Sequence, residues 1–253
     1  MSQIIAVVNQ KGGVGKTTTA VNLTAALHEA GKRVLLCDFD PQANATSGFG
    51  VEKNRGLSVY DVLAEKCTAK EAVVHTDCGD VIPSSSQLAG AAVELIAVEN
   101  REFVLHDALK TLEDDYDYIF IDCPPSLELL TLNALCAAKS ILVPVQCEYY
   151  ALEGLSDLMG TLRAVKARLN PSLYIYGVAL TMFDARLRLS YQVAEEVRKH
   201  FPGKVFAAMV PRNVRLSEAP SHGRPVTAYD KHSRGAEAYR QLAKECILKE
   251  GRP

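Results

Sequence analysis

The strongest chemical signal in the chain is a glycine-rich run at residues 12–17, Gly-Gly-Val-Gly-Lys-Thr, between an apolar segment and a helical pattern. Glycines let backbone N–H groups turn toward phosphate oxygens, and the start of a helix adds partial positive charge. In such a loop the lysine reaches the outer phosphates and the threonine hydroxyl coordinates Mg²⁺. The spacing therefore predicts a nucleoside triphosphate site. Its residues are Gly12, Gly13, Val14, Gly15, Lys16, Thr17 and Thr18.

This loop departs from the usual phosphate-loop pattern at its first position. That pattern, GxxxxGK[ST], expects a glycine five residues before Gly15, where this chain has Gln10 followed by Lys11. Lys16 alone is enough to hold the phosphates of one nucleotide. Lys11 is then either a loosely held surface lysine or a cation that points away from its own site.

Three aspartates follow apolar runs and could supply the carboxylates that Mg²⁺ and an attacking water need. Asp38 and Asp40 follow the run at 34–37, and Asp122 follows the run at 118–121. Ligands of an open parallel sheet bind beyond the carboxyl ends of its strands, so we expect these carboxylates beside the phosphate loop. Asp122 is a predicted Mg²⁺ ligand, directly or through water. One such aspartate alone is often a helix cap or turn former, but three behind one phosphate loop predict a hydrolytic site.

The elements that position these residues are predicted by apolar periodicity. Short uninterrupted apolar runs are typical of strands buried on both faces, and helical patterns alternate with them. This alternation predicts an α/β fold, a mostly parallel sheet with helices on both faces, as a single domain over residues 1–253. Residues 42–100 are the least regular part. The expected strands are residues 4–8, 34–37, 118–121, 141–145, 175–180 and 205–210; the expected helices are residues 17–30, 101–112, 127–138, 152–169, 187–201 and 235–248.

Composition places the chain among ordinary globular proteins. Of its 253 residues 48% are hydrophobic and 23% charged, and its apolar stretches are far shorter than the roughly 20 residues of a membrane helix. We expect no membrane span and no signal peptide. The seven cysteines are an odd number without a CxxC pair, which favours reduced, buried thiols in the cytoplasm over disulfides or a metal site.

The net charge of −2 conceals an imbalance along the chain. From residue 181 onward there are 14 lysines and arginines against 8 aspartates and glutamates. Such an asymmetry suggests an anionic partner for the C-terminal third, although solvated helix faces produce the same composition.

Long stretches of the chain resemble one protein family. KGGVGKTT, at residues 11–18, resembles the deviant Walker A motif of the ParA/MinD family of dimerising P-loop ATPases. DPQANATSGFG at 40–50, VIPSSSQLAGAAVEL at 81–95 and DCPPSLELLTLNAL at 122–135 resemble the chromosomal, Soj-like branch of that family. The resemblance extends over nearly the whole chain.

The resemblance implies specific roles at the nucleotide site. Lys11 would cross a two-fold interface to the partner's phosphates, so that catalysis demands a dimer. Asp40 would position or activate the hydrolytic water, with Asp38 in support. Pro211 and Asn213 would contact adenine, although Asn213 taken by itself is a turn residue. The implied cofactors are ATP and Mg²⁺, and the catalytic set is Lys11, Lys16, Asp38, Asp40 and Asp122.

Soj-like proteins bind DNA without sequence preference as ATP dimers, and the resemblance extends this activity to the C-terminal third. Arg186 and Arg215 match residues assigned to DNA contact, and an arginine fork suits phosphate. The family also implies a ParB-type (Spo0J-like) partner that stimulates hydrolysis, and a cytoplasmic protein at the nucleoid. We expect hydrolysis to be slow in isolation, because the sequence offers no strong general base beyond the aspartates. Residues that would extend the DNA surface are Arg188, Arg198, Lys199, Arg224 and Arg234.

Three other functions fit parts of the sequence. A MinD-like membrane-associated ATPase needs a basic amphipathic C-terminal helix, but charges flanking the apolar stripe at 239–247 are mixed, so we expect that helix to dock on the body. A metal-cluster protein would use Cys123 and Cys136, which lack ligand-like spacing. A metabolic ligase needs its own acid/base residues, and the six histidines are scattered.

Overall fold

An eight-stranded sheet, in the order β3-β4-β2-β5-β1-β6-β7-β8, forms the centre of the protein in a computed structural model that describes residues 2–149 and 153–250. β3 and β4 pair antiparallel, and the other neighbouring strands pair parallel. The predicted apolar runs form six of these strands. The residues of β1, β2, β5, β6 and β7 are mostly buried because helices cover both faces, whereas β8, at the edge of the sheet, is only partly buried. These strands are β1 (Gln3–Val7), β2 (Val34–Asp38), β5 (Tyr118–Asp122), β6 (Ser140–Gln146), β7 (Tyr174–Phe183) and β8 (Val205–Pro211).

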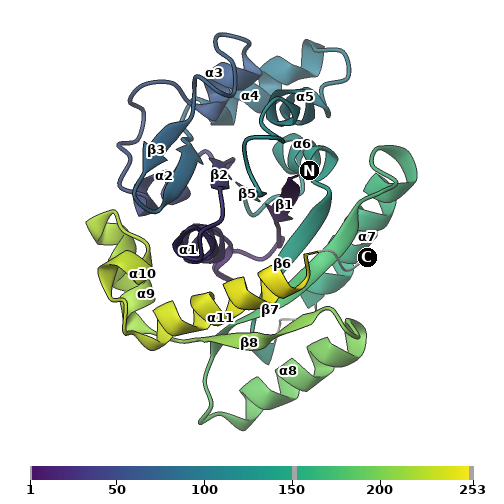
Figure 1. Cartoon of the computed structure of the whole chain (residues 1–253). Coiled ribbons are helices and arrows are strands. Elements are labelled where there is room, and N and C mark those ends of the chain that lie inside the picture. The colour runs from purple at the N-terminus through teal and green to yellow at the C-terminus, as the bar shows by residue number, and fades with distance from the viewer. Residues whose placement is uncertain (1, 150–152, 251–253) are drawn as a thin grey trace.

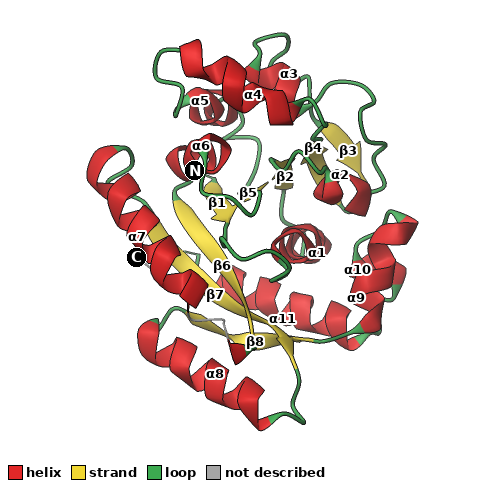
Figure 2. Cartoon of the chain, turned by 180° about the vertical axis from the view of Figure 1, so that it is seen from behind, coloured by secondary structure: helices red, strands yellow, loops and turns green. Residues whose placement is uncertain are grey.

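Helices on the two faces of the sheet enclose two hydrophobic cores (Figures 1 and 2). One core lies under α1 and α11, which pack against each other, with α11 also against β8. The other lies under α5, α6, α7 and α8. The predicted α/β architecture is therefore confirmed. The helices are α1 (Lys16–Glu29), α5 (Val104–Lys110), α6 (Leu129–Ala137), α7 (Glu153–Arg168), α8 (Arg188–His200) and α11 (Arg234–Leu248).

These long helices match the predicted ones with shifted ends. The largest difference is α5, expected over 101–112 and observed over Val104–Lys110, with turns on both sides. Residue 152, the expected start of α7, lies outside the described residues. Helix ends fray and often change to single turns, so an apolar period locates them only to within a few residues.

Short elements were missed by the sequence analysis. They contain three to seven residues, too few to show a helical or strand period. In the segment 42–100 they are α2 (Asn44–Gly48), α3 (Val59–Leu63), β3 (Val74–Thr76), β4 (Gly79–Ile82), α4 (Leu88–Glu94) and the 3₁₀ turn η1 (Leu95–Ala97); near the C-terminus they are α9 (Val214–Glu218), η3 (Ala219–His222) and α10 (Val226–Tyr229).

Strand register brings three chain segments to one edge of the sheet. Val7 of β1 and Asp38 of β2 both pair with Asp122, the last residue of β5. Because these neighbours run parallel, the loops that follow them leave from the same edge. The predicted phosphate loop and the predicted carboxylates therefore meet there.

Tight packing between β7 and β8 at Gly177 gives a test of the fold. A Cβ at Gly177 would lie 2.1 Å from Cε2 of Phe206, whose ring is buried. We expect Gly177→Ala to lower the free energy of unfolding by about 1–3 kcal/mol, because the ring must shift within a packed core. Urea denaturation measures this change. Gly160→Ala is the control: Gly160 lies inside α7 with nothing within 4 Å of an added Cβ, and alanine there should stabilise by about 0.5–1 kcal/mol. Equal stabilities for the two variants would contradict the packing.

Candidate functional site

The loop between β1 and α1 is shaped to receive an anion. Gly13 and Gly15 adopt left-handed backbone angles, with φ of 75° and 87°, and α1 begins directly after them at Lys16. A Cβ at Gly12 or Gly13 would meet nothing within 4 Å, so open space lies beside this part of the loop. N–H groups at a helix N-terminus and the helix dipole both favour a phosphate in such a space.

Two polar side chains that the sequence analysis missed hold this loop against neighbouring strands. The Asn9 side chain donates to the Pro144 carbonyl at 2.8 Å and accepts from the Lys11 N–H at 3.0 Å. The Thr181 hydroxyl donates to the Val14 carbonyl at 2.8 Å. A polar residue interrupting or ending an apolar strand was the only sequence signal for either one. Loop shape is thus fixed by β6 and β7 as well as by its own glycines.

Lys16 is buried at the loop, and its charge is partly balanced by a carboxylate. Its Nζ donates to the Lys11 carbonyl at 3.1 Å. Burial lowers the pKa of Lys16, and the negative charges of Asp122 and Asp40 oppose that shift. The side chain is therefore held in place by the loop itself, next to the predicted Mg²⁺ ligand.

Asp122 is a fully buried carboxylate at the end of β5. Burial raises its pKa well above the usual aspartate value, while the Thr17 hydroxyl and Lys16 favour its charged form. Thr17 lies close, yet neither Asp122 oxygen makes a hydrogen bond of standard geometry to the described residues. Buried carboxylates are normally paired, and a hard cation with oxygen ligands would supply the missing partner. Thr17 and Asp122 together fit Mg²⁺.

Asp38 and Asp40 have different environments although they are two residues apart. Asp38 is fully buried and accepts bonds from the Thr46 N–H and hydroxyl, both at 2.7 Å, and from the Asp40 N–H at 3.2 Å. Burial raises the pKa of Asp38 to about 6, against the effect of these bonds. Ser84 N–H donates in turn to the Thr46 hydroxyl. Asp38 therefore fixes the loop that carries Asp40.

Asp40 lies within that fixed loop. Its carboxylate accepts from the Gln42 N–H at 3.0 Å, and its carbonyl accepts from the Ala43 N–H. Ala43 has φ of 52°, a left-handed conformation that is uncommon for a residue with a side chain. Asp40 also acts electrostatically on Lys16 and Asp122, so it shares their site.

A cavity of about 510 Å³ opens beside the phosphate loop, between α1 and the end of β8. Its walls include Gly15 and Thr18 from the loop side and Pro211 and Asn213 from the β8 side. The Asn213 oxygen caps α9 by accepting from the Arg215 N–H at 2.8 Å, which is the turn role expected from its residue type. The predicted adenine residues thus border a cavity of ligand size next to the predicted phosphate site.

Arg186 is an exposed arginine in the turn between β7 and α8. Its side chain is 87% exposed and forms a two-point ion pair with Asp184, with distances of 3.0 and 2.7 Å. This pairing lowers the pKa of Asp184 to about 2. Ion pairs at the surface contribute little to stability, so another anion could compete with Asp184 for Arg186.

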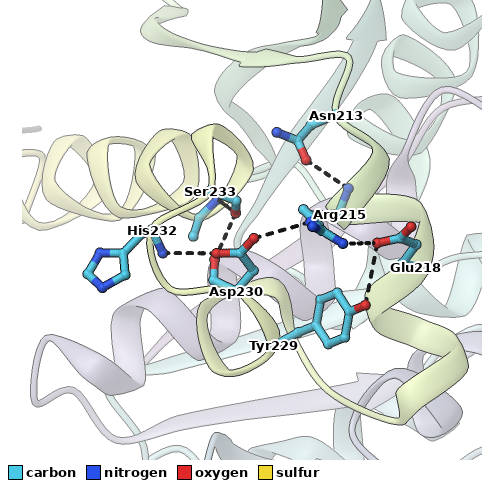
Figure 3. A network of polar contacts seen from close by, with 8 residues as sticks. Asn213, Arg215, Glu218, Tyr229, Asp230, His232 and Ser233 are labelled. Carbon is cyan, nitrogen blue, oxygen red and sulfur yellow. Dashed lines mark hydrogen bonds and ion pairs between the residues drawn. The ribbon is translucent and has the colours of Figure 1, made fainter.

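Arg215, in α9, forms the centre of a polar network (Figure 3). Its guanidinium pairs with Glu218 at 2.7 Å and with Asp230 at 3.2 Å, and Tyr229 donates to the same Glu218 carboxylate. In this arrangement two carboxylates neutralise one arginine. The additional basic residues named from the sequence are all exposed: Arg188, Arg198, Lys199, Arg224 and Arg234.

Side-chain bonds connect α1 to the C-terminal third. Asn22 donates to the Thr18 carbonyl at 2.7 Å and accepts from the Val226 N–H at 2.6 Å. The Thr19 and Tyr239 hydroxyls share a hydrogen bond at 3.2 Å. Helix α11 packs its apolar side on α1 and β8, so the expectation that it docks on the body is confirmed. None of these bonds had a sequence signal.

The structure also bears on the residues that a metal-cluster protein or a membrane-associated protein would use. Cys123 and Cys136 are both buried free thiols, and burial raises the pKa of Cys136 to about 11. Over residues 2–149 and 153–250, histidine, cysteine and acidic side chains form no group of three or more that could hold a metal ion. Within those same ranges every helix is too short or too polar to cross a membrane.

Comparison with known proteins identifies the family. A family model described as an AAA domain matches residues 2–175. The chain is 58% identical to the sporulation initiation inhibitor protein Soj of Bacillus subtilis, over 97% of this chain and 98% of Soj. It is 52% identical to the chromosome partitioning protein ParA of Myxococcus xanthus, over 99% of this chain and 89% of ParA.

Among solved structures, cobyrinic acid a,c-diamide synthase of Mycobacterium smegmatis with bound ADP and magnesium has a TM-score of 0.87 and 37% identity, covering 100% of this chain and 96% of that one. The neighbour confirms the fold of a nucleotide- and magnesium-binding protein, whereas the sequence is closer to the partitioning proteins. Taken together, the site and the similarity over nearly its full length show that the chain belongs to the ParA/Soj family of chromosome-partitioning ATPases.

Proposed function

We propose that this protein, as one domain over residues 1–253, is an ATP-driven switch that dimerises on ATP, binds DNA without sequence preference, and acts in chromosome partitioning. The observation that carries the proposal is the buried Asp122, which lacks a hydrogen bond of standard geometry to the described residues and lies beside Lys16 and Thr17 at a deviant phosphate loop, in a chain 58% identical to Soj. Membership of this family makes the protein an ATPase. Dimerisation, DNA binding and the partner are the proposed part.

Nucleotide binding rests on the loop and its adjoining cavity. The N–H groups of Gly12–Gly15 and the Lys16 ammonium hold the phosphates, while Pro211 and Asn213 hold the base. Thr17 and Asp122 hold Mg²⁺, which when bound would neutralise charge on the outer phosphates. Asp40 orients the attacking water, and Asp38 keeps Asp40 in place through its bonds to Thr46. Hydrolysis is slow in isolation, because the sequence offers no strong general base beyond these aspartates.

Lys11 is proposed to complete the site of a second copy. It precedes the first loop glycine, and its carbonyl already holds Lys16, so backbone and side chain serve different purposes at this residue. A cation from the partner adds positive charge where the transition state develops negative charge, as an arginine finger does. Catalysis therefore requires the dimer in this scheme.

DNA contact is assigned to Arg186 and Arg215 on the basic C-terminal third. Phosphate can replace the carboxylates that now pair with these two exposed arginines, since ion pairs at the surface contribute little. One small patch binds DNA weakly, whereas two patches on one dimer act with a high effective concentration. A ParB-type protein is the proposed partner, and the proposed location is the cytoplasm, at the nucleoid. A MinD-like membrane role is disfavoured because the apolar side of α11 is buried.

Separate substitutions of Lys11 and Lys16 test the different roles proposed for them. Lys16→Ala should weaken ATP binding by roughly 100-fold or more, because charge-assisted bonds to phosphate are lost. Lys11→Ala should keep ATP binding but lose the ATP-dependent dimer and about 10²–10³ in turnover. Fluorescent-nucleotide titration and analytical ultracentrifugation measure the two effects. A Lys11→Ala protein that still dimerises and hydrolyses normally would refute the role of Lys11.

Asp40→Ala should lower turnover by about 100-fold or more, since the group that orients the water is removed. ATP binding should persist, so the variant accumulates as an ATP dimer on size-exclusion chromatography with Mg²⁺. A variant that elutes only as a monomer with saturating ATP, or that keeps wild-type turnover, would show that Asp40 has another role.

Changes around Arg215 test the DNA surface. Arg215→Glu should weaken DNA binding by about tenfold or more and reduce the salt slope by about one unit per arginine. Asp230→Asn should instead strengthen binding about two- to threefold, because it removes an anion that competes with phosphate. Mobility shifts at two salt concentrations measure both, with Asp157→Asn on α7 as the matched control. If Arg215→Glu leaves DNA affinity unchanged, the surface lies elsewhere.

A further inference from the structure

The loop that carries Asp40 turns sharply just after that residue. Ala43 is buried and has φ of 52°, in the left-handed region that is unfavourable for a residue with a side chain. Gln42 and Asn44, on either side of it, are exposed. A strained conformation of this kind persists only where surrounding contacts enforce it. Contacts that hold Gln42 and Asn44 therefore help to decide the shape of the turn next to Asp40.

Lys53 makes such contacts with both neighbours of Ala43. Its ammonium group donates to the Gln42 carbonyl at 2.6 Å and to the Asn44 side-chain oxygen at 3.2 Å. One cation thus bridges the strained residue from its two sides. Hydrogen bonds in which the donor is charged are stronger than bonds between two neutral groups. Lys53 is therefore placed to stabilise the left-handed turn at Ala43.

Gln42 connects this bridge to the carboxylate that is proposed to orient the attacking water. Its N–H donates to the Asp40 carboxylate at 3.0 Å, while its carbonyl accepts from Lys53. One residue thus orients Asp40 and binds Lys53 at the same time. A rotation of Gln42 that broke the bond to Lys53 would also move the N–H group that orients Asp40.

The segment that carries Lys53 is itself anchored to the body of the protein. On one side of Lys53 the Val51 N–H donates to the Thr46 carbonyl at 3.2 Å. On the other side the Asn54 side-chain oxygen accepts from the Ser86 N–H at 2.9 Å and from the Ser86 hydroxyl at 3.1 Å. The exposed lysine therefore extends from a fixed backbone. Its bonds to the turn cost less conformational entropy than they would from a flexible loop.

We propose that Lys53 is a positioning residue for ATP hydrolysis, which holds the turn at Ala43 and thereby keeps Asp40 aligned with the attacking water. Misplacing a catalytic group by about 1 Å can lower a rate by as much as 100-fold, so a contact outside the reacting atoms can matter to turnover. Lys53 acts through Gln42 and Asn44, so its loss affects turnover and leaves ATP binding unchanged. The inference rests on the proposed role of Asp40.

Lys53→Met tests this role, because it removes the ammonium group and keeps most of the apolar stem. We expect steady-state turnover of ATP with Mg²⁺ by the full chain to fall about three- to tenfold, the effect of losing hydrogen bonds from a charged donor. The Kd of a fluorescent ATP analogue should stay unchanged. Lys53→Arg, which keeps a charged donor, should restore most of the turnover. Lys110→Met, at an exposed lysine on α5, is the matched control and should alter neither quantity.

The Asp40→Ala background separates positioning from a general loss of structure. Once Asp40 is absent its alignment no longer matters, so Lys53→Met should cause no further loss in single-turnover reactions with radiolabelled ATP. Equal fractional losses in the two backgrounds would overturn the proposal, as would wild-type turnover in Lys53→Met alone. Wild-type turnover in Asp40→Ala would instead refute the proposed role of Asp40, and this inference with it. Urea denaturation verifies that Lys53→Met is folded, and Lys53→Gln replaces it if it is not.

Discussion

Burial of the Asp122 carboxyl group at the end of β5 is the constraint on which the nucleotide site depends. Asp122 is fully enclosed without a hydrogen bond of standard geometry to the described residues, and Lys16, itself buried, is a cation acting on it. Removing a carboxylate from water is costly unless it is paired, so packing elsewhere in the fold must offset the desolvation free energy of this side chain. The parallel register of β1, β5 and β2 keeps the side chain buried, because β1 and β2 flank the end of β5 on both sides. A magnesium nucleotide would complete the missing pairing.

The surrounding loops are held by side-chain bonds rather than by regular structure. Asp38 anchors the segment that carries Asp40 through Thr46, and Asn9 and Thr181 anchor the phosphate loop. Asn22 extends this support from Thr18 to Val226, just ahead of the segment where Asp230 pairs with Arg215. The nucleotide loop and the Arg215 network are therefore connected through α1 by a short series of bonds. A contiguous network of this kind can carry energetic coupling between a bound nucleotide and the basic surface.

Charge is distributed between two regions of the fold. The C-terminal third presents exposed arginines on α8 and α9, while two cavities among α3, α4, η1 and α5 are lined by carboxylates: Glu65, Glu71, Glu94, Glu99 and Asp107. Each sign selects a different kind of partner, because like charges at a contact oppose association. The near-neutral total charge of the chain conceals this separation.

The sequence by itself determined the sheet, the long helices and the phosphate loop. Apolar periodicity and the placement of glycines are local properties of the chain, and they do not depend on which other segments pack nearby. It also indicated which aspartates follow strands. Only the tertiary structure decided that Asp122 lacks a hydrogen bond of standard geometry to the described residues while Asp38 is bonded to Thr46, and that Arg215 is neutralised by Glu218 and Asp230. The short elements of residues 42–100 were likewise undetermined. Side-chain pairing, burial and the shape of cavities depend on residues that are distant in the chain. A local sequence pattern does not indicate which distant residues will be in contact.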